Sequence, residues 1–493
     1  MDFERVKDVS LRNKVNDALT TVRDFFKDGV SVAFSGMAGT AVPKEIPKAI
    51  AEVSRERGEG LKIRALLVSG TTTKSFEECI AAANIQKRYL IAGGGVMREK
   101  INQGKIEFYD FWLSEYSRLV RHSAIPGGGL DIAVIEATYI DENGNIIPSL
   151  SLDSTPAIAN AAKMVIVEVN TKKPVLQGIH DVYVPEYRTP IPIRDVGDRV
   201  GLPYLKIPKS KIVSIVISDA QEEYAAAYQP STETEQKIAR NIIEFLECSD
   251  VVGEKMVLQA GVGPLASSLI DELPQKNVSV WTEVAPVKWA LAVPEKISSM
   301  STACLYTLKG EEKFRDEFYE NFDKVSKNIV IRPYEVTNSL EVISRLQVIC
   351  VQQALEVDLY GNVNVSHIDG KIYNGVGGSG DFTRASHLTI VALPSTAAGE
   401  KVSRIVPFTF HIDITDHDVD VVVTEQGWAD LRGLSPKSRA RLIIEKCAHP
   451  SFKDVLHKYI DKVDKLEAHA PVDLEAFTQF LQTRSSIKKS SDS

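Results

Sequence analysis

The sequence predicts an α/β protein with largely parallel sheets, built from two tandem domains. Short β-branched runs alternate with helical runs along most of the chain. Such βαβ alternation is typical of parallel strands that are covered by helices on both faces of the sheet. The order of segments in the first half also recurs in the second half, which favours a duplicated α/β unit.

The first half contains most of one predicted domain. Its expected elements, in chain order, are strands at 30–34 and 61–70, a helix at 75–84, and strands at 87–95 and 130–138. The second series follows Pro203 and consists of a strand at 211–217, a helix at 232–247, and strands at 255–261, 277–283, 388–394 and 419–427. We therefore expect an N-terminal domain over residues 1–215 and a C-terminal domain over residues 216–493.

The repeated order of segments is clearest between residues 131–170 and residues 353–393. Each segment runs from a strand through an acidic turn with a Gly-Asn pair to a polar stretch and another strand. A ligand cleft is expected between the two copies. Only the second copy carries a glycine cluster, so we place the chemistry mostly there.

Composition limits the class of protein. The chain has 493 residues, of which 44% are hydrophobic and 25% charged, as in ordinary globular proteins. A net charge of −8 argues against a nucleic-acid partner, which needs clustered Lys and Arg. Five widely spaced cysteines without a CxxC pair indicate thiols in a reducing compartment. The N-terminus lacks a signal-like apolar segment and no run approaches the ~18 apolar residues of a membrane span, so we expect a cytoplasmic protein with no membrane partner.

The glycine cluster is formed by Gly375, Gly377, Gly378 and Gly380. Glycines let backbone N–H groups converge on an anion, such as a developing oxyanion or a phosphate. The alternative is that the loop is only a tight turn.

A dinucleotide site is a competing interpretation of a different segment. Gly261, Gly263 and Ala266 have GxGxxA spacing after a predicted strand, and Glu283 closes the next strand. Such an acid could bind a ribose hydroxyl. However, Pro264 interrupts the pattern and no hydride-transfer partner is recognisable.

Several motifs, in order along nearly the whole chain, resemble the acetyl-CoA hydrolase/transferase family of class I CoA-transferases. They are SGMAGTAVPKEIPKAI (35–50), VMREKINQGKIEFYD (96–110), GIHDVY (178–183), TEV (282–284), DLYGNVN (358–364), GVGGSGDF (375–382), VPFTFHIDITDHDVDV (406–421) and VVVTEQGWADLRGLSP (421–436). The resemblance implies two NagB/RpiA/CoA-transferase-like domains and a homodimer. It also implies that Glu283 is a nucleophile that becomes a glutamyl-CoA thioester.

The resemblance assigns roles to further residues. Gly377 and Gly378 would supply oxyanion donors, and Glu425 would be a second active-site carboxylate, unless it only caps a helix. Ser35, Thr72 and Gln352 would lie near the substrate, although Ser35 could equally be a helix N-cap. The remaining predicted contacts are those to coenzyme A, from Gly261, Gly263 and Gly380.

Two departures from the family pattern concern the acceptor acid. Gln352 stands where the family usually has Asn, and Glu223 stands where an Arg could meet a carboxylate. Because Arg binds a carboxylate and Glu repels it, a small monocarboxylate is favoured over a dicarboxylate.

Histidines and aspartates crowd residues 411–420, but the family pattern has the same crowding without a catalytic metal. We therefore expect a hydrogen-bond network and no metal. His367 and His387 are expected to be satisfied polar groups, since a carboxylate mechanism needs no imidazole.

The sequence thus favours an acyl-CoA:carboxylate CoA-transferase acting on short-chain acids with an acetate-type acceptor. Its small-molecule partners would be acyl-CoA and a carboxylate, and no permanently bound cofactor is expected. The alternatives are an acyl-CoA hydrolase, which would share every residue named above, an NAD-dependent oxidoreductase, and a non-enzymatic CoA-binding module.

Overall fold

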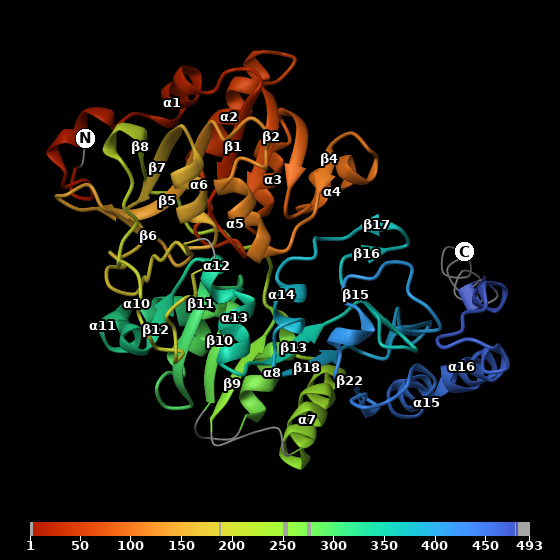
Figure 1. The fold of residues 1–493 in the computed structure, drawn as a ribbon. Helices are drawn as coiled ribbons and strands as arrows, with labels where there is room; N and C mark the ends of the chain where they lie inside the picture. The colour runs from red at the N-terminus through yellow and green to blue at the C-terminus, as the bar shows by residue number, and fades with distance from the viewer. Residues whose placement is uncertain (1–2, 187–188, 250–254, 274–277, 479, 482–493) are drawn as a thin grey trace. The chain divides into compact units, whose positions relative to one another are not determined.

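The computed structural model describes residues 3–186, 189–249, 255–273, 278–478 and 480–481 (Figure 1). The chain forms two compact units, each assembled from separate stretches of sequence. Unit 1 comprises residues 1–228, 276–346 and 372–381, and unit 2 comprises residues 229–275, 347–371 and 382–493. The expected division of the sequence into domains at residues 1–215 and 216–493 stays a prediction.

The first half of the chain builds a largely parallel sheet in unit 1. Its strands lie in the order β4-β3-β2-β1-β5-β7-β8, and β6 pairs antiparallel with β5. The strands are β1 (Val30–Phe34), β2 (Lys62–Val68), β3 (Asn84–Tyr89), β4 (Glu107–Tyr109), β5 (Ile132–Ile140), β6 (Ile146–Pro148), β7 (Met164–Asn170) and β8 (Ile212–Ser218). Every residue of β1 is buried, as expected for a central parallel strand.

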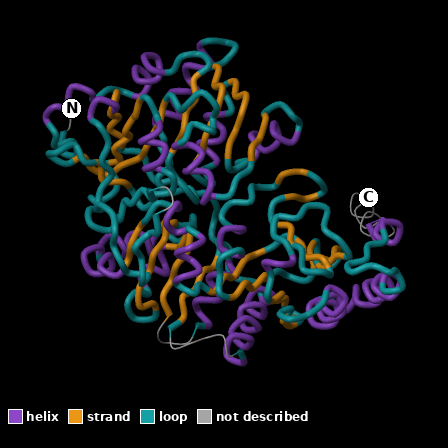
Figure 2. Tube along the Cα trace, in the orientation of Figure 1, coloured by secondary structure: helices purple, strands orange, loops and turns teal. Residues whose placement is uncertain are grey.

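Helices alternate with these strands along the chain (Figure 2). They are α1 (Ala18–Phe25), α2 (Glu45–Glu56), α3 (Lys74–Ile80), α4 (Gly95–Asn102), α5 (Leu113–Arg121) and α6 (Thr155–Ala161). Apolar residues from strands and helices form one continuous core in this unit. The α/β class with mostly parallel sheets is therefore confirmed.

Unit 1 also contains a second parallel group of strands, β10 (Val278–Pro286), β11 (Ile297–Tyr306) and β12 (Ile329–Ile331), in the order β12-β11-β10. Backbone hydrogen bonds join this group to the first half, from Leu152 N to Ala303 O at 2.9 Å and from Leu305 N to Leu150 O at 2.8 Å. The accompanying helices are α9 (Val287–Leu291), α10 (Glu312–Glu320), α11 (Phe322–Val325), α12 (Tyr334–Thr337) and α13 (Leu340–Arg345).

Unit 2 has a parallel run of strands in the order β9-β13-β18-β22, with β23 antiparallel to β22. These strands are β9 (Met256–Ala260), β13 (Ile349–Gln353), β18 (Leu388–Ala392), β22 (Val421–Thr424) and β23 (Gly427–Asp430). The main helices are α7 (Glu233–Cys248), α8 (Pro264–Glu272), α15 (Pro436–Cys447) and α16 (Pro450–Val463). The shorter strands are β14 (Glu356–Asp358), β15 (Val363–Asn364), β16 (His367–Ile368), β17 (Lys371–Ile372), β19 (Thr396–Ala397), β20 (Val402–Ser403) and β21 (Ile405–Val406).

The neighbour relations of the strands repeat between the two halves of the chain. The order β4-β3-β2 of the first half has its counterpart in β12-β11-β10, and β5-β7-β8 has its counterpart in β13-β18-β22. This repetition fits the duplicated α/β unit that the repeated order of segments in the sequence predicted.

Several predicted element boundaries are wrong, among them the following three. The helix expected at 75–84 ends at Ile80, because Asn84 already donates a backbone hydrogen bond to Leu61 and begins β3. The strand expected at 87–95 ends at Tyr89, ahead of a loop in which Gly93 has a φ of 81°. The strand expected at 419–427 is a hairpin, because β22 ends at Thr424 and the chain reverses into β23.

Of the helices in the described part of the chain, none combines the length and the apolar character needed to cross a lipid bilayer.

Candidate active site

Glu283 lies within β10 and not at its end, because the strand continues to Pro286 through pairing of Val284 with Cys304 and of Ala285 with Leu305. The strand holds the backbone of Glu283 firmly, and its carbonyl oxygen also accepts a hydrogen bond from Thr302 Oγ1 at 3.1 Å. The side chain of Glu283 is largely buried. A carboxylate placed in this way has little freedom to move away from its surroundings.

The side chain of Asn338 donates a hydrogen bond to the Glu283 carboxylate. Asn338 Nδ2 donates to Glu283 Oε2 at 3.1 Å and also to Asp381 Oδ2 at 3.1 Å. The pKa of Glu283 is raised to about 7, mainly by burial; the hydrogen bond from Asn338 opposes this shift, and the negative charge of Asp381 adds to it. Glu283 is therefore partly ionised near neutral pH and more basic than an ordinary glutamate.

The glycine loop lies directly against this carboxylate. A Cβ atom on Gly378 would overlap the Glu283 side chain and lie 2.5 Å from Asn338 Nδ2. Gly377 has a φ of 57°, in the left-handed region that favours glycine. The loop leads into the short helix α14 (Ser379–Thr383). The structure thus places Gly378 against Glu283, and a side chain at Gly378 would collide with that carboxylate. The predicted oxyanion roles of Gly377 and Gly378 stay predictions.

Gly380 allows a different close approach. A Cβ atom there would lie 2.6 Å from Trp112 Nε1, so glycine is needed for the loop to pack on the indole. The predicted role of Gly380 in binding coenzyme A stays a prediction.

Ser35 and Thr72 are also in unit 1, and both hydroxyl groups have protein partners. Ser35 Oγ donates to Ala41 O at 2.9 Å and accepts from Glu136 N at 3.0 Å, and helix α2 begins only at Glu45. The alternative that Ser35 is a helix N-cap is therefore wrong. Thr72 Oγ1 donates to the Glu77 carboxylate, which forms a buried ion pair with Arg88 at 2.7 Å. Substrate contact by either residue stays a prediction.

The other predicted site residues belong to unit 2. Glu425 lies in the β22–β23 turn and accepts hydrogen bonds from Ser395 N at 2.8 Å and from Ser395 Oγ. Burial alone would raise the pKa of Glu425, but hydrogen bonds from Ser395 and Gln426 lower it below the usual value, so it is ionised at neutral pH. The helix-cap alternative for Glu425 is wrong, because its partner is the loop residue Ser395.

Gly261 and Gly263 follow β9 and precede α8, which begins at Pro264. Gln353 lies beside them, with its Nε2 donating to Val262 O at 2.8 Å, while Gln352 Nε2 donates to the Gln353 carbonyl at 2.9 Å. The strand–glycine–helix context of a dinucleotide fingerprint is thus present. Glu283, however, is engaged by Asn338 instead of being left for a ribose hydroxyl.

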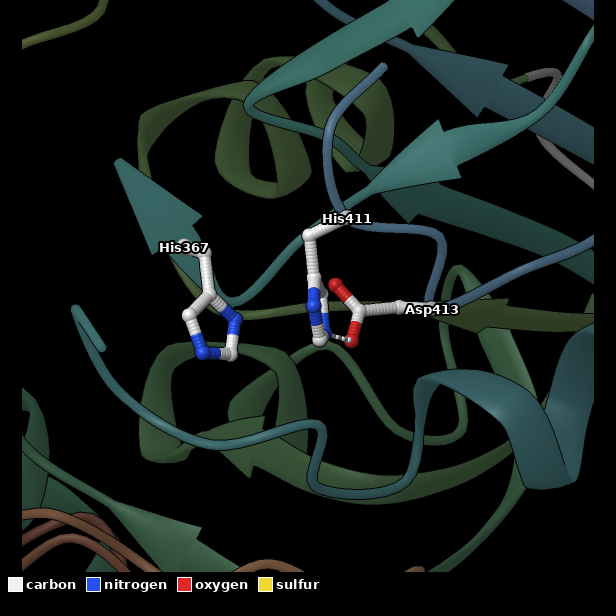
Figure 3. Close-up of side chains that lie close together, drawn as sticks. All are labelled: His367, His411 and Asp413. Atoms are coloured by element: carbon white, nitrogen blue, oxygen red, sulfur yellow. Dashed lines mark hydrogen bonds and ion pairs between the residues drawn. The ribbon is translucent and has the colours of Figure 1, made fainter. Parts of the chain in front are cut away.

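His411 and Asp413, from the 411–420 segment, lie close to His367, and His411 is hydrogen-bonded to Asp413 (Figure 3). Asp413 accepts hydrogen bonds from His411 Nε2 at 3.0 Å, from Val365 N at 2.7 Å, and from both the N and the Oγ of Ser366 at 2.9 and 2.8 Å. These donors already occupy the carboxylate, so the network that the sequence favoured accounts for the arrangement. The expectation that the protein uses no metal stays a prediction.

Sequence reasoning missed Asn338 and Ser114. Asn338 follows the short helix α12, and Ser114 lies in the first turn of α5, where its N and Oγ both donate to Asp381. Neither residue lies in a periodic or glycine-rich pattern, so no local signal could have identified them.

Comparison with known proteins settles the family. The acetyl-CoA hydrolase/transferase N-terminal domain matches residues 9–217, and the corresponding C-terminal domain matches residues 315–460. The chain belongs to the acetyl-CoA hydrolase/transferase family. It is 36% identical to the succinyl-CoA:acetate CoA-transferase of Clostridium kluyveri over 98% of this chain and 92% of that protein. It is also 36% identical to the acetyl-CoA hydrolase of Schizosaccharomyces pombe over 93% of this chain and 91% of that protein.

Solved structures of similar fold share the architecture of this chain. RipA from Yersinia pestis has a TM-score of 0.73 at 22% identity, covering 94% of this chain and all of RipA. A 4-hydroxybutyrate CoA-transferase from Porphyromonas gingivalis has a TM-score of 0.63 at 23% identity, covering 92% of this chain and 98% of that one. These likenesses show the fold, and the family match shows an enzyme of the CoA-transferase or acyl-CoA hydrolase kind.

Proposed function

We propose that this member of the family is an acyl-CoA:carboxylate CoA-transferase that works through a glutamyl-CoA thioester on Glu283. The observation that carries the proposal is the buried Glu283 carboxylate, which is hydrogen-bonded by Asn338 and faces a glycine that cannot be replaced without collision. The substrates would be a short-chain acyl-CoA and a small carboxylate such as acetate. The relatives named for both chemistries support acyl-CoA as the donor.

The proposed reaction begins when ionised Glu283 attacks the thioester carbonyl of the acyl-CoA. The C–S bond breaks, coenzyme A leaves as the thiolate, and the acyl group is joined to Glu283 as a mixed anhydride. The thiolate then attacks the glutamyl carbonyl, releasing the first carboxylate and leaving Glu283 as a CoA thioester. An incoming carboxylate reverses the two steps, so the free energy of the thioester is retained.

The surroundings of Glu283 suit this chemistry. A pKa of about 7 makes the carboxylate more basic, and hence more nucleophilic, than an exposed glutamate while leaving a useful ionised fraction at neutral pH. A fixed near-attack geometry can lower the barrier by about 7–11 kcal/mol. Backbone N–H groups near Gly377 and Gly378 are the proposed oxyanion donors.

Borohydride trapping tests this proposal. The protein is incubated with acetyl-CoA alone, treated with borohydride to reduce any glutamyl thioester, and digested for peptide mass analysis. We expect the peptide containing Glu283 to change mass in the wild type and to stay unchanged in Glu283→Gln. An unmodified Glu283 under conditions in which acetyl-CoA is turned over would contradict the mechanism.

Acetyl-CoA hydrolase is the second candidate, and it is favoured by the relatives that carry that name. The two activities differ in whether water or a carboxylate resolves the activated glutamyl group. A transferase requires an added acid and forms a new acyl-CoA from it, whereas a hydrolase releases free thiol without an acceptor. Propionate added to acetyl-CoA, with product analysis by mass spectrometry, separates the two.

We also propose a homodimer, as the commonest assembly of soluble enzymes. Light scattering after size-exclusion chromatography should give twice the chain mass of 54.3 kDa. A cytoplasmic location stays a prediction.

A further inference from the structure

A continuous chain of hydrogen bonds links the nucleophile candidate to helix α5. Asn338 Nδ2 bridges Glu283 Oε2 and Asp381 Oδ2, at 3.1 Å to each. Asp381 accepts from Ser114 N at 3.1 Å through Oδ2 and from Ser114 Oγ at 2.5 Å through Oδ1. Ser114 is therefore linked to Glu283 through the side chains of Asp381 and Asn338.

The two carboxylates fix the orientation of the Asn338 amide. An ionised carboxylate only accepts hydrogen bonds, so Nδ2 is the atom that faces Glu283 and Asp381, and Oδ1 accepts from Thr337 Oγ1 at 2.8 Å on the other side. Asn338 and Asp381 are completely buried. Because a buried amide turned the other way would place its oxygen against both carboxylates, Asp381 allows only one arrangement of Asn338.

The same stretch of chain also holds the glycine loop. The Asp110 carboxylate accepts from Val376 N at 3.1 and 3.0 Å, and Leu113 N donates to Gly377 O at 3.3 Å. Residues 110–114 thus contact the loop on both sides of Gly377, and the bond from Ser114 to Asp381 completes the attachment. Residues 110–114 therefore help to position both the glycine loop and Glu283, although they belong to neither.

We propose that Ser114 and Asp381 are positioning residues for Glu283. Ser114 fixes the Asp381 carboxylate, Asp381 fixes the amide of Asn338, and Asn338 holds Glu283 Oε2, which leaves Oε1 as the attacking oxygen. This inference rests on the proposed function of Glu283 as a covalent nucleophile. It adds a source for the geometry of that nucleophile: Ser114 lies outside the family motifs quoted above, whereas Asp381 lies within GVGGSGDF.

Single-turnover kinetics with acetyl-CoA test the inference. We measure the rate of formation of the enzyme-CoA thioester in the wild type, Ser114→Ala and Asp381→Asn, with Ser117→Ala as the matched control. Ser117 is a buried serine one turn further along α5, whereas Ser114 is half-buried. We expect Ser114→Ala to lower the loading rate by about 10- to 100-fold with little change in KM, because loss of alignment acts on the chemical step. Ser117→Ala should load at the wild-type rate.

Asp381→Asn adds a second measurement, the pH dependence of the loading rate, which would not change if Asp381 had a purely structural role. The charge of Asp381 raises the pKa of Glu283, so its removal lowers that pKa. Since the attacking carboxylate must be ionised, the acid limb of the rate–pH profile should shift to lower pH while the rate at its plateau falls.

The outcomes separate the two proposals. If the wild type forms no adduct on Glu283, the proposed function fails. If the wild type forms the adduct, and Ser114→Ala and Asp381→Asn both load at the wild-type rate with an unmoved acid limb, the positioning role is overturned. An equal loss in Ser117→Ala would also overturn it. Should Asp381→Asn not fold, Ser114→Ala against Ser117→Ala decides alone, because both remove only one hydroxyl group.

Discussion

At the scale of single residues, the environment that raises the pKa of Glu283 also costs stability. Burial raises its pKa to about 7, above the value of 4.5 for an ordinary glutamate. The folded state therefore holds a proton that the unfolded chain releases between these two values, and the free energy of unfolding falls as pH rises from about 4.5 to about 7. Such a conflict between stability and function is common at active sites.

We predict that Glu283→Gln is more stable than the wild type at pH 8 by up to about 3 kcal/mol, and that the difference disappears near pH 4.5. The neutral amide carries no desolvated charge at either pH. Guanidinium denaturation of both proteins at pH 8 and pH 4.5 measures the effect. An equal difference at the two pH values would show that the carboxyl group is not strained by burial.

Gly378 gives a second residue-scale prediction. Gly378→Ala should lower the loading of Glu283 with coenzyme A by about 100-fold or more, since its Cβ would force the carboxylate out of place. Gly94→Ala is a suitable control, because a Cβ at Gly94 meets no atom within 4 Å. Single-turnover loading compares the two variants, and retention of wild-type loading by Gly378→Ala would mean that the loop can move freely.

At the scale of elements, helix α2 depends on a residue far away in the sequence. Glu168 in β7 accepts backbone hydrogen bonds from Lys44, Glu45 and Ile46 at 2.7, 3.0 and 3.3 Å. The first residue before the helix, Lys44, makes no side-chain cap of its own. A carboxylate from the sheet thus replaces the local N-cap that most helices have.

We predict that Glu168→Ala lowers the free energy of unfolding by about 2 kcal/mol or more, because it leaves buried N–H groups without an acceptor. Glu52→Ala, an exposed change on the same helix, should be close to neutral. Urea denaturation midpoints measure both. A Glu168→Ala protein as stable as Glu52→Ala would show that other groups satisfy the helix end.

The hairpin at Glu425 shows why sequence patterns do not predict where some strands end. The apolar run at 419–424 predicts a strand well, but the reversal after Thr424 depends on Glu425 binding Ser395 in another loop. Likewise, β10 reads as ending at Glu283, yet its pairing with β11 continues to Pro286. Long-range pairing fixes these boundaries, so local composition predicts the elements and misplaces their ends.

At the scale of the whole molecule, the five cysteines differ in how deeply the fold buries them. Cys304, Cys350 and Cys447 are buried, Cys79 is partly buried, and Cys248 is exposed. Burial raises the pKa of Cys79, Cys304, Cys350 and Cys447, which keeps them as unreactive thiols.

We predict that a thiol reagent labels Cys248 rapidly in the native protein and the other four only on unfolding. Labelling followed over time, with peptide mapping, measures the order of reaction. Replacing Cys248 by Ser should remove the fast phase. Rapid native labelling of Cys304, Cys350 or Cys447 would contradict the burial described for them.

The sequence by itself determined the α/β class, most strands, the family and the pairing of an acid on a strand with a glycine loop. Apolar runs, turn residues and ordered motifs are local properties, and each can be read without knowing what lies across the fold. Only the tertiary structure decided what surrounds Glu283, because Asn338, Asp381 and Ser114 come from three separate segments and meet through side-chain hydrogen bonds. Contacts between segments distant in sequence leave no trace in local pattern, and it is these contacts that set the charge and orientation of the Glu283 carboxylate.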